Sequence, residues 1–361
     1  VGRRAAGWVL SGVPFGLASS SSSSGSVWAR PVGQSLPMWG PLMNNSKELE
    51  FDIRTYGNPK KPCVVSIIGA GLSMNAMNLV VESLAEEGLF VINFNPRDVC
   101  GSKANRQCEA LIPEGKNLME EMGKIFQADG SIDMEGDFYA PFNWFDMADD
   151  VAAILDKLGI EKASIIGFST GATIAQCVMC RIPDRLNSAV IISSAYDVVP
   201  MEKPYKDATL QERLRMQGSL TADSSREERV TKLLPGYLAM FQIADDDPRV
   251  EIAKKAIEDD FDNGWINPHG PMNPYSVLSW ASWAKSHEEH QAMLKENEVP
   301  CLIIAGRTDP VVPFVQSEKL MDNCGNAYFE IHEHGHVLGP VISTTVLLTT
   351  IGTFIRGRSV K

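Results

Sequence analysis

The chain has 361 residues, enough for one large α/β domain with an inserted or appended piece, or for two smaller domains. Its hydrophobic content of 44% and charged content of 22% are typical of a soluble globular protein. The net charge of −12 argues against nucleic acid and anionic membrane surfaces as partners, because both are bound through positive charge. The sequence also has no apolar stretch long enough to span a bilayer as a helix.

The first 47 residues differ from the rest of the chain. They contain arginines and an unbroken serine tract over 19–24, and the first acidic residue is Glu48. Such a stretch cannot bury enough apolar surface to order itself, so we exclude 1–47 from the fold. Its composition suits the transit peptide of an organelle. The remnant of a secretory signal, a disordered extension and a translation-start artefact are the alternatives.

The seven cysteines are odd in number and scattered, and several lie in apolar stretches, where a cysteine behaves as a small hydrophobic residue. They indicate reduced thiols and an intracellular protein, in the cytoplasm or in an organelle. Cys177 and Cys180 have the Cys-x-x-Cys spacing of redox and zinc sites. They fall inside a predicted helix and lack a partner pair, which favours core packing.

After residue 48, strand and helix patterns alternate along the chain. Residues 49–56 alternate apolar and polar side chains, as in a half-exposed strand, whereas 63–68 is apolar on both faces, as in a central parallel strand. This alternation predicts a mostly parallel, doubly wound sheet with helices on both faces. The elements that follow are a helix over 75–87, a strand over 89–95, a surface excursion over 103–142 with a helical piece at 118–126, a helix over 144–158, a strand over 163–168, a helix over 172–180 and a strand over 189–193.

The alternation stops near residue 198 and resumes at 299. We therefore predict a helical cap over 198–298, inserted into an α/β core formed by 48–197 and 299–361. Helical patterns within the cap cover 210–216, 226–239, 250–261 and 274–294. A strand over 301–305, a helix over 313–321, a strand over 327–331 and a helix over 341–355 complete the core.

On the last cap helix, His287 and His290 flank two glutamates. The pair lacks the His-Glu-x-x-His spacing of zinc enzymes, which indicates a solvent-facing helix surface rather than a metal site.

Ser169 is the candidate nucleophile. The strand over 163–168 runs into Gly167-Phe168-Ser169-Thr170-Gly171, and a small-residue helix follows. A strand that reverses into a helix within a few residues holds its central residue in strained geometry, and flanking glycines remove the Cβ atoms that would collide. The serine oxygen is expected at the tip of this turn, beside the unpaired amides that begin the helix. A Gly-rich turn with an idle serine is the alternative.

A serine nucleophile needs a base to take its proton and a carboxylate to orient that base. Asp309 and His336 each follow a predicted strand, at the edge where open α/β sheets place their sites. Asp309 alone could instead cap a helix or close a turn. The alternating His332, His334 and His336 could suggest a metal site, but no acidic fourth ligand is obvious, so no metal is predicted.

The negative oxygen that forms during acyl transfer needs two hydrogen-bond donors. We expect these to be the backbone amides of Thr170, directly after the nucleophile, and of Ala70, in the small-residue loop over 69–73. A loop of this kind could instead hold a dinucleotide phosphate. The Gly-x-Gly-x-x-Gly pattern is incomplete, however, because Met74 stands where the third glycine would be.

Several motifs match one family. They are the Gly-x-Ser-x-Gly turn, Gly306-Arg307-Thr308-Asp309-Pro310, Gly335-His336 and Arg97-Asp98-Val99-Cys100-Gly101-Ser102. With the chain order Ser, Asp, His, the sequence over about 48–357 resembles the serine α/β-hydrolase superfamily, and the insertion stands in the place of the family's cap. The loop over 69–73 is most similar to the aklavinone methylesterase-like branch. Members of that branch hydrolyse carboxylic esters, including methyl esters of polyketides.

The resemblance implies the α/β-hydrolase fold and cofactor-free hydrolysis of a small apolar ester through an acyl-enzyme on Ser169. The same residues would serve a thioesterase, a lipase or a carbon–carbon bond hydrolase, and a ligand receptor or scaffold is the non-catalytic alternative. The pocket that we expect over the site includes residues of the cap, and these could instead pack in the core of the cap. The residues expected to line the pocket are Gly71, Leu72, Met240, Phe241, Trp280 and Trp283.

Overall fold

The computed structural model describes residues 46–126, 133, 135–198, 220–221, 223–240, 243–265, 273–309, 311–333, 335–336 and 345–359. All of them belong to one unit that spans 41–361. Residues 1–45 of the predicted leader, the predicted helix over 210–216 and the start of the predicted last helix lie outside the described residues.

Seven strands form one sheet in the order β1-β3-β2-β4-β5-β6-β7. β1 pairs antiparallel with β3 and the other neighbouring pairs are parallel, which confirms the predicted mostly parallel sheet. The first strand begins at Ile53 and is shorter than predicted. Leu49 and Phe51 are buried as the alternating pattern suggests, but they precede the residues that pair with β3. The strands are β1 (Ile53–Tyr56), β2 (Cys63–Ile67), β3 (Phe90–Phe94), β4 (Ala163–Phe168), β5 (Leu186–Ile192), β6 (Cys301–Gly306) and β7 (Ala327–His332).

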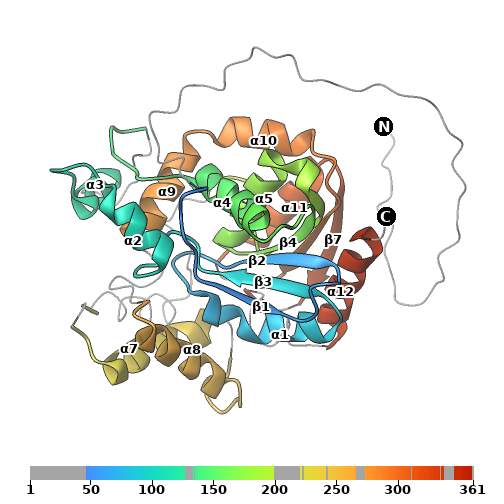
Figure 1. Cartoon of the computed structure of the whole chain (residues 1–361), viewed down its shortest axis with the longest axis horizontal. Helices are drawn as coiled ribbons and strands as arrows, with labels where there is room; N and C mark the ends of the chain where they lie inside the picture. The colour runs from blue at the N-terminus through green and yellow to red at the C-terminus, as the bar shows by residue number, and fades with distance from the viewer. Residues whose placement is uncertain are drawn as a thin grey trace, which may run out of the picture. The chain divides into compact units, whose positions relative to one another are not determined.

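Helices cover both faces of this sheet (Figure 1). Successive strand residues point to opposite faces, so Val64 packs with α1 and α12 whereas Val65 packs with α4 and α5. The predicted doubly wound arrangement is therefore confirmed. The helices of the core are η1 (Met74–Met77), α1 (Asn78–Glu86), α4 (Trp144–Lys157), α5 (Thr170–Arg181), η2 (Pro183–Arg185), α11 (Phe314–Asn323) and α12 (Thr345–Ser359).

The segment over 103–142 contains two helices, α2 (Lys103–Ala110) and α3 (Leu118–Ile125). The helical piece at 118–126 is confirmed as α3, but α2 was not predicted, because its sequence has no continuous apolar stripe. Ser102 caps α2 by accepting from the amide of Asn105, and Cys108 is buried in the core. The segment is therefore anchored to the core rather than lying wholly on the surface.

The predicted cap contains α7 (Arg226–Met240), α8 (Val250–Asp262), α9 (Pro274–Ala284) and α10 (His287–Lys295) among its described residues. The single predicted helix over 274–294 is two helices in the structure, α9 and α10. Both contribute to the same hydrophobic cluster as α4 and α5, through residues such as Leu278 and Leu294. The division into core and cap at 198 and 298 stays a prediction.

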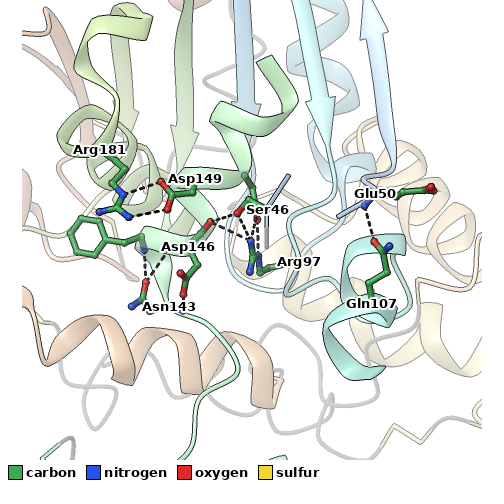
Figure 2. Close-up of polar contacts among 10 residues, drawn as sticks. Ser46, Glu50, Arg97, Gln107, Asn143, Asp146, Asp149 and Arg181 are labelled. Carbon is green, nitrogen blue, oxygen red and sulfur yellow. Dashed lines mark hydrogen bonds and ion pairs between the residues drawn. The ribbon is translucent and has the colours of Figure 1, made fainter. Parts of the chain in front are cut away.

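A buried ion pair joins the turn after β3 to α4. The Arg97 guanidinium contacts the Asp150 carboxylate, with Nε 2.7 Å from Oδ2, and both side chains are almost fully buried. Figure 2 shows Arg97 directed at Ser46 and at the Asp146 carbonyl, with Nη2 2.9 Å from Ser46 Oγ. A second pair, Arg181 with Asp149, is separate from this network and more exposed. Arg97 thus fixes the turn after β3 against α4.

Over the described ranges, none of the helices combines the length and the hydropathy that crossing a membrane requires.

Candidate active site

Ser169 occupies the turn between β4, which ends at Phe168, and α5, which begins at Thr170. Its φ of 51° and ψ of −120° lie in a region that residues with a side chain rarely adopt. The strained turn that the sequence predicts is therefore present. The amides of the first turn of α5 have no acceptor within the helix, so the positive end of the helix faces this serine.

Close contacts between backbones make the glycine at 171 necessary. A Cβ atom there would lie 2.3 Å from the carbonyl oxygens of both Ile67 and Ile68 at the end of β2. Ser169 itself is held by the neighbouring strand, because its amide donates to the carbonyl oxygen of Ile192 at 3.0 Å. The turn is therefore packed tightly between the ends of β2 and β5.

The loop over 69–73 lies beside the serine. A Cβ atom on Gly69 would be 3.2 Å from Ser169 Cβ and 3.7 Å from Ser169 Oγ. The amide of Leu72 donates to the carbonyl oxygen of Gly69 at 3.1 Å, which closes a β-turn. The Gly69 carbonyl and the Ala70 N–H belong to one peptide group, so this hydrogen bond also sets the direction of that N–H. The structure thus places Gly69, which directly precedes Ala70, beside Ser169, and Thr170 follows Ser169 in the chain.

Asp309 and His336 are in direct contact. His336 Nδ1 lies 2.7 Å from Asp309 Oδ2, and the two side chains are 1% and 2% exposed. The other carboxylate oxygen, Oδ1, accepts from the amides of Val311 and Val312 at 2.7 and 2.9 Å. These three contacts fix the orientation of the carboxylate, with one oxygen toward the imidazole.

A second set of contacts ties the loop after β6 to the loop after β7. The amide of Arg307 donates to the carbonyl oxygen of His332 at 2.8 Å, and Arg307 Nε lies 2.9 Å from Glu333 Oε1. His332 pairs with Glu330 on its own strand, with Nε2 and Oε1 3.1 Å apart. His334, the third of the alternating histidines, lies outside the described residues.

Because β4, β6 and β7 run parallel, Ser169, Asp309 and His336 all follow the carboxyl ends of strands at one edge of the sheet. The structure brings Asp309 to His336 and the loop over 69–73 to Ser169.

The expected pocket residues of the cap are placed differently. Trp283 is 2% exposed and packs against Trp144, with ring centroids 4.5 Å apart, and Trp280 is 9% exposed in the same cluster. These surroundings are those of core residues. Phe241 and the side chain of Met240 lie outside the described residues.

The prediction of a solvent-facing surface around His287 and His290 is wrong for His290. This residue is 1% exposed, and its ring packs edge-on against Phe145 and Trp283. Burial lowers the pKa of His290 to about 3, so the ring is neutral near pH 7. The core-packing prediction for Cys177 is confirmed: its thiol is buried, 3.9 Å from His290 Nε2.

Two carboxylates beside the loop over 69–73, Asp98 buried and Asp260 partly buried, were not predicted. Asp98, in the turn after β3, accepts from the amide of Gly71 at 3.3 Å. Asp260, on α8, accepts from Ser73 Oγ and from Asn75 Nδ2, the latter at 2.7 Å. Burial raises the pKa of both, to about 7 for Asp260.

Local sequence gives little warning of these contacts. Asp98 and Gly71 are 27 residues apart, and Asp260 and Ser73 are 187 apart. The one signal is that Asp98 directly follows Arg97 in a turn that matches a family motif. No pattern marks Asp260 within its acidic helix.

Relatives of known name include a methylesterase and an acetyltransferase. Rhodomycin D methylesterase DauP of Streptomyces sp. strain C5 is 25% identical over 309 residues, which are 78% of this chain and 87% of that protein. Ethanol acetyltransferase 1 of Wickerhamomyces ciferrii is 27% identical over 226 residues, which are 58% of this chain and 52% of that protein. The chain spans about half the length of the ethanol acetyltransferases that it matches.

Among solved structures, a thermophilic esterase from Thermogutta terrifontis has a TM-score of 0.55 at 16% identity, and the match covers 86% of this chain and 95% of that one. At this identity the likeness concerns the fold. A family model described as alpha/beta hydrolase fold matches residues 64–339. This range includes the loop over 69–73, the serine turn, the predicted cap, Asp309 and His336. The chain therefore belongs to the α/β-hydrolase family.

Proposed function

We propose that the protein is a serine hydrolase that cleaves a carboxylic ester of a small apolar molecule through an acyl-enzyme. Ser169 is the nucleophile, His336 the general base and Asp309 the carboxylate that orients the imidazole. The observation that carries the proposal is the 2.7 Å contact between His336 Nδ1 and Asp309 Oδ2, together with the strained turn at Ser169.

In the first step, His336 takes the proton of Ser169 Oγ as the oxygen attacks the ester carbonyl. Because Nδ1 is occupied by Asp309, Nε2 is the nitrogen that accepts this proton. The tetrahedral oxyanion is held by the amides of Ala70 and Thr170, and its collapse expels the alcohol, which receives the proton from His336.

In the second step, His336 removes a proton from a water molecule that attacks the acyl-enzyme. The acid leaves, and the proton returns to Ser169 Oγ. No redox change occurs, and each proton passes through the one imidazole.

The test is hydrolysis of p-nitrophenyl butyrate by the full chain. Ser169→Ala should lower kcat by at least about 10⁴-fold and should abolish labelling by a fluorophosphonate probe. Ser66→Ala is a matched control: Ser66 is a buried serine on β2 whose Oγ has no hydrogen-bond partner among the described residues. If Ser169→Ala kept the wild-type rate, or if the wild type stayed unlabelled, the protein would be a non-catalytic binder or use another mechanism.

Acyl transfer to an alcohol is the second candidate, favoured by the similarity to ethanol acetyltransferase 1. The acyl-enzyme is the same, but an alcohol instead of water attacks it, and the product is an ester. Incubating the enzyme with p-nitrophenyl acetate and ethanol separates the two. A transferase gives mainly ethyl acetate, whereas a hydrolase gives mainly acetate.

Measuring the rate of hydrolysis over a panel of esters identifies the substrate class. Expected preference is for small apolar acyl and alcohol groups, over thioesters and long-chain glycerides. Methyl esters belong on the panel because of the similarity to the rhodomycin D methylesterase.

A further inference from the structure

Asp98 connects the loop beside Ser169 to α9. Its Oδ2 accepts a hydrogen bond from the amide of Gly71 at 3.3 Å and another from Ser276 Oγ at 2.7 Å. Its main-chain oxygen accepts from Asn273 Nδ2 at 3.0 Å. The residue is 2% exposed, and no ion pair of Asp98 is found within the described part of the chain. Burying a carboxyl group without a cation is unfavourable, so its retention at this place needs a reason.

The reason lies in the β-turn over 69–72. Gly71 is the third residue of this turn and has a φ of 60°, as in a type II turn. Type I and type II turns differ by a flip of their central peptide, here the one between Ala70 and Gly71. In the observed orientation the Gly71 N–H points to Asp98. After a flip, the Ala70 carbonyl oxygen would face Asp98, and the Gly71 N–H would lose this acceptor.

The flip matters for chemistry because Ala70 supplies one of the two proposed oxyanion donors. Its N–H belongs to the peptide just before the one that Asp98 holds, and both peptides meet at the Ala70 Cα atom. A Cβ atom on Gly69, on the other side, would touch Ser169. The Ala70 N–H keeps its direction only while the turn over 69–72 stays intact and in place, and the bond from Gly71 to Asp98 is a contact that ties this turn to the rest of the core.

We propose that Asp98 is a positioning residue, which holds the loop over 69–73 in the one turn conformation that aims the Ala70 amide at the reacting carbonyl oxygen. The inference rests on the proposed function. Asp98 touches no substrate in this role; it acts through Gly71. Its second bond is made to Ser276 on α9 and not to the loop.

The oxyanion bond is made in the transition state, so losing its alignment lowers kcat and leaves KM nearly unchanged. For Asp98→Ala we expect kcat to fall about 10²-fold, the loss expected when a catalytic group is misplaced by about 1 Å. Asp98→Asn keeps an oxygen that can accept from Gly71, so it should restore most of the wild-type kcat.

The experiment measures kcat and KM with p-nitrophenyl butyrate, and the inhibition constant of a trifluoromethyl ketone, whose adduct with Ser169 carries the oxyanion. Asp98→Ala should weaken this inhibitor by about the factor lost in kcat, while KM stays near the wild-type value. Ser276→Ala is the control, because it removes a hydrogen bond from the same carboxylate oxygen and leaves the bond to Gly71 intact.

The proposal is overturned if Asp98→Ala keeps the wild-type kcat, if Asp98→Asn is as slow as Asp98→Ala, or if Ser276→Ala loses as much rate as Asp98→Ala. Thermal melts establish that each variant is folded. If Asp98→Ala does not fold, Asp98→Ser takes its place, since it keeps a polar group at this position while its hydroxyl ends one atom short of the carboxylate oxygen that accepts from Gly71.

Failure of the proposed function looks different. A wild-type protein that neither hydrolyses esters nor reacts with fluorophosphonate refutes the serine mechanism itself. An active wild type with an unaffected Asp98→Ala refutes only the role of Asp98.

Discussion

The imidazole of His336 lies 2.7 Å from the carboxylate of Asp309, and that carboxylate is fixed on its other side by two backbone amides. We predict that Asp309→Asn lowers kcat for ester hydrolysis by about 10⁴-fold, because an amide stabilises the wrong imidazole tautomer and cannot balance its charge. Steady-state kinetics with p-nitrophenyl butyrate measure the effect.

Asp322→Asn, an exposed change on the neighbouring α11, serves as the control and should leave kcat unchanged. Loss of less than tenfold in Asp309→Asn would mean that another carboxylate orients the base.

The backbone contact at Gly171 leads to a prediction about stability. Gly171→Ala would push a methyl group to 2.3 Å from two carbonyl oxygens, so it should destabilise the protein and abolish activity together. We expect a loss of about 1–3 kcal/mol or more in the free energy of unfolding. Urea denaturation measures it.

The matched control is Gly123→Ala, in α3, where a Cβ atom meets nothing within 4 Å. Replacing an exposed helical glycine by alanine should stabilise the protein by up to about 1 kcal/mol. If both substitutions changed the free energy of unfolding equally, the close contact of residue 171 with the end of β2 would not be what restricts this position to glycine.

The buried pair of Arg97 and Asp150 should be costly to break. Arg97→Met leaves Asp150 unpaired in the core, and we expect a loss of about 3–5 kcal/mol in the free energy of unfolding. The double variant Arg97→Met/Asp150→Leu should recover part of this loss, because it removes the stranded charge as well.

Lys255→Met breaks a pair with Asp259 in which the lysine is 70% exposed, and it should change stability by no more than about 1 kcal/mol. Chemical denaturation measures both variants. If Arg97→Met and Lys255→Met lost the same free energy of unfolding, burial would not be what makes the Arg97–Asp150 pair costly to break.

Asp260 should make stability depend on pH. Burial raises its pKa to about 7 from an ordinary value of 3.8, with a further increase from Asp259 and an opposing effect from Arg54. Tyr237, on α7, also interacts electrostatically with Asp260. The folded state therefore binds the proton more tightly than the unfolded chain, so this contribution is complete below pH 3.8 and is lost as the pH rises through 7.

We predict that the melting temperature of the wild type, taken relative to Asp260→Asn, falls between pH 5 and pH 8. Asp259→Asn, the neighbouring carboxylate, should retain the wild-type trend. A constant difference between wild type and Asp260→Asn across this range would show that the carboxyl does not titrate there.

Sequence patterns predicted the sheet and the serine turn because both are encoded locally. The strand over 163–168 is apolar throughout, and the glycines around Ser169 mark the reversal within a few residues. The same reasoning missed α2, which is held by its cap at Ser102 and by single buried residues rather than by an apolar stripe. It also placed His290 on the surface, because the two glutamates before it look solvated.

The contacts around the loop over 69–73 were beyond local reasoning for a different reason. Asp98 and Ser276 are 178 residues apart, and only the folded sheet brings them together. A pattern can therefore indicate which loop supplies the Ala70 amide. What holds that loop is decided by tertiary packing.

The packing of α9 and α10 into the same cluster as α4 and α5 bears on how this protein can be recombined with its relatives. A chimera that exchanges the whole of 198–298 would remove Leu278, Trp283 and Leu294 from the core, and with Ser276 the partner of Asp98. An exchange that ends before Asn273 keeps them. The portion ahead of α9 can thus be exchanged without these losses, provided that Asp260 on α8, which accepts from Ser73 and Asn75, is kept.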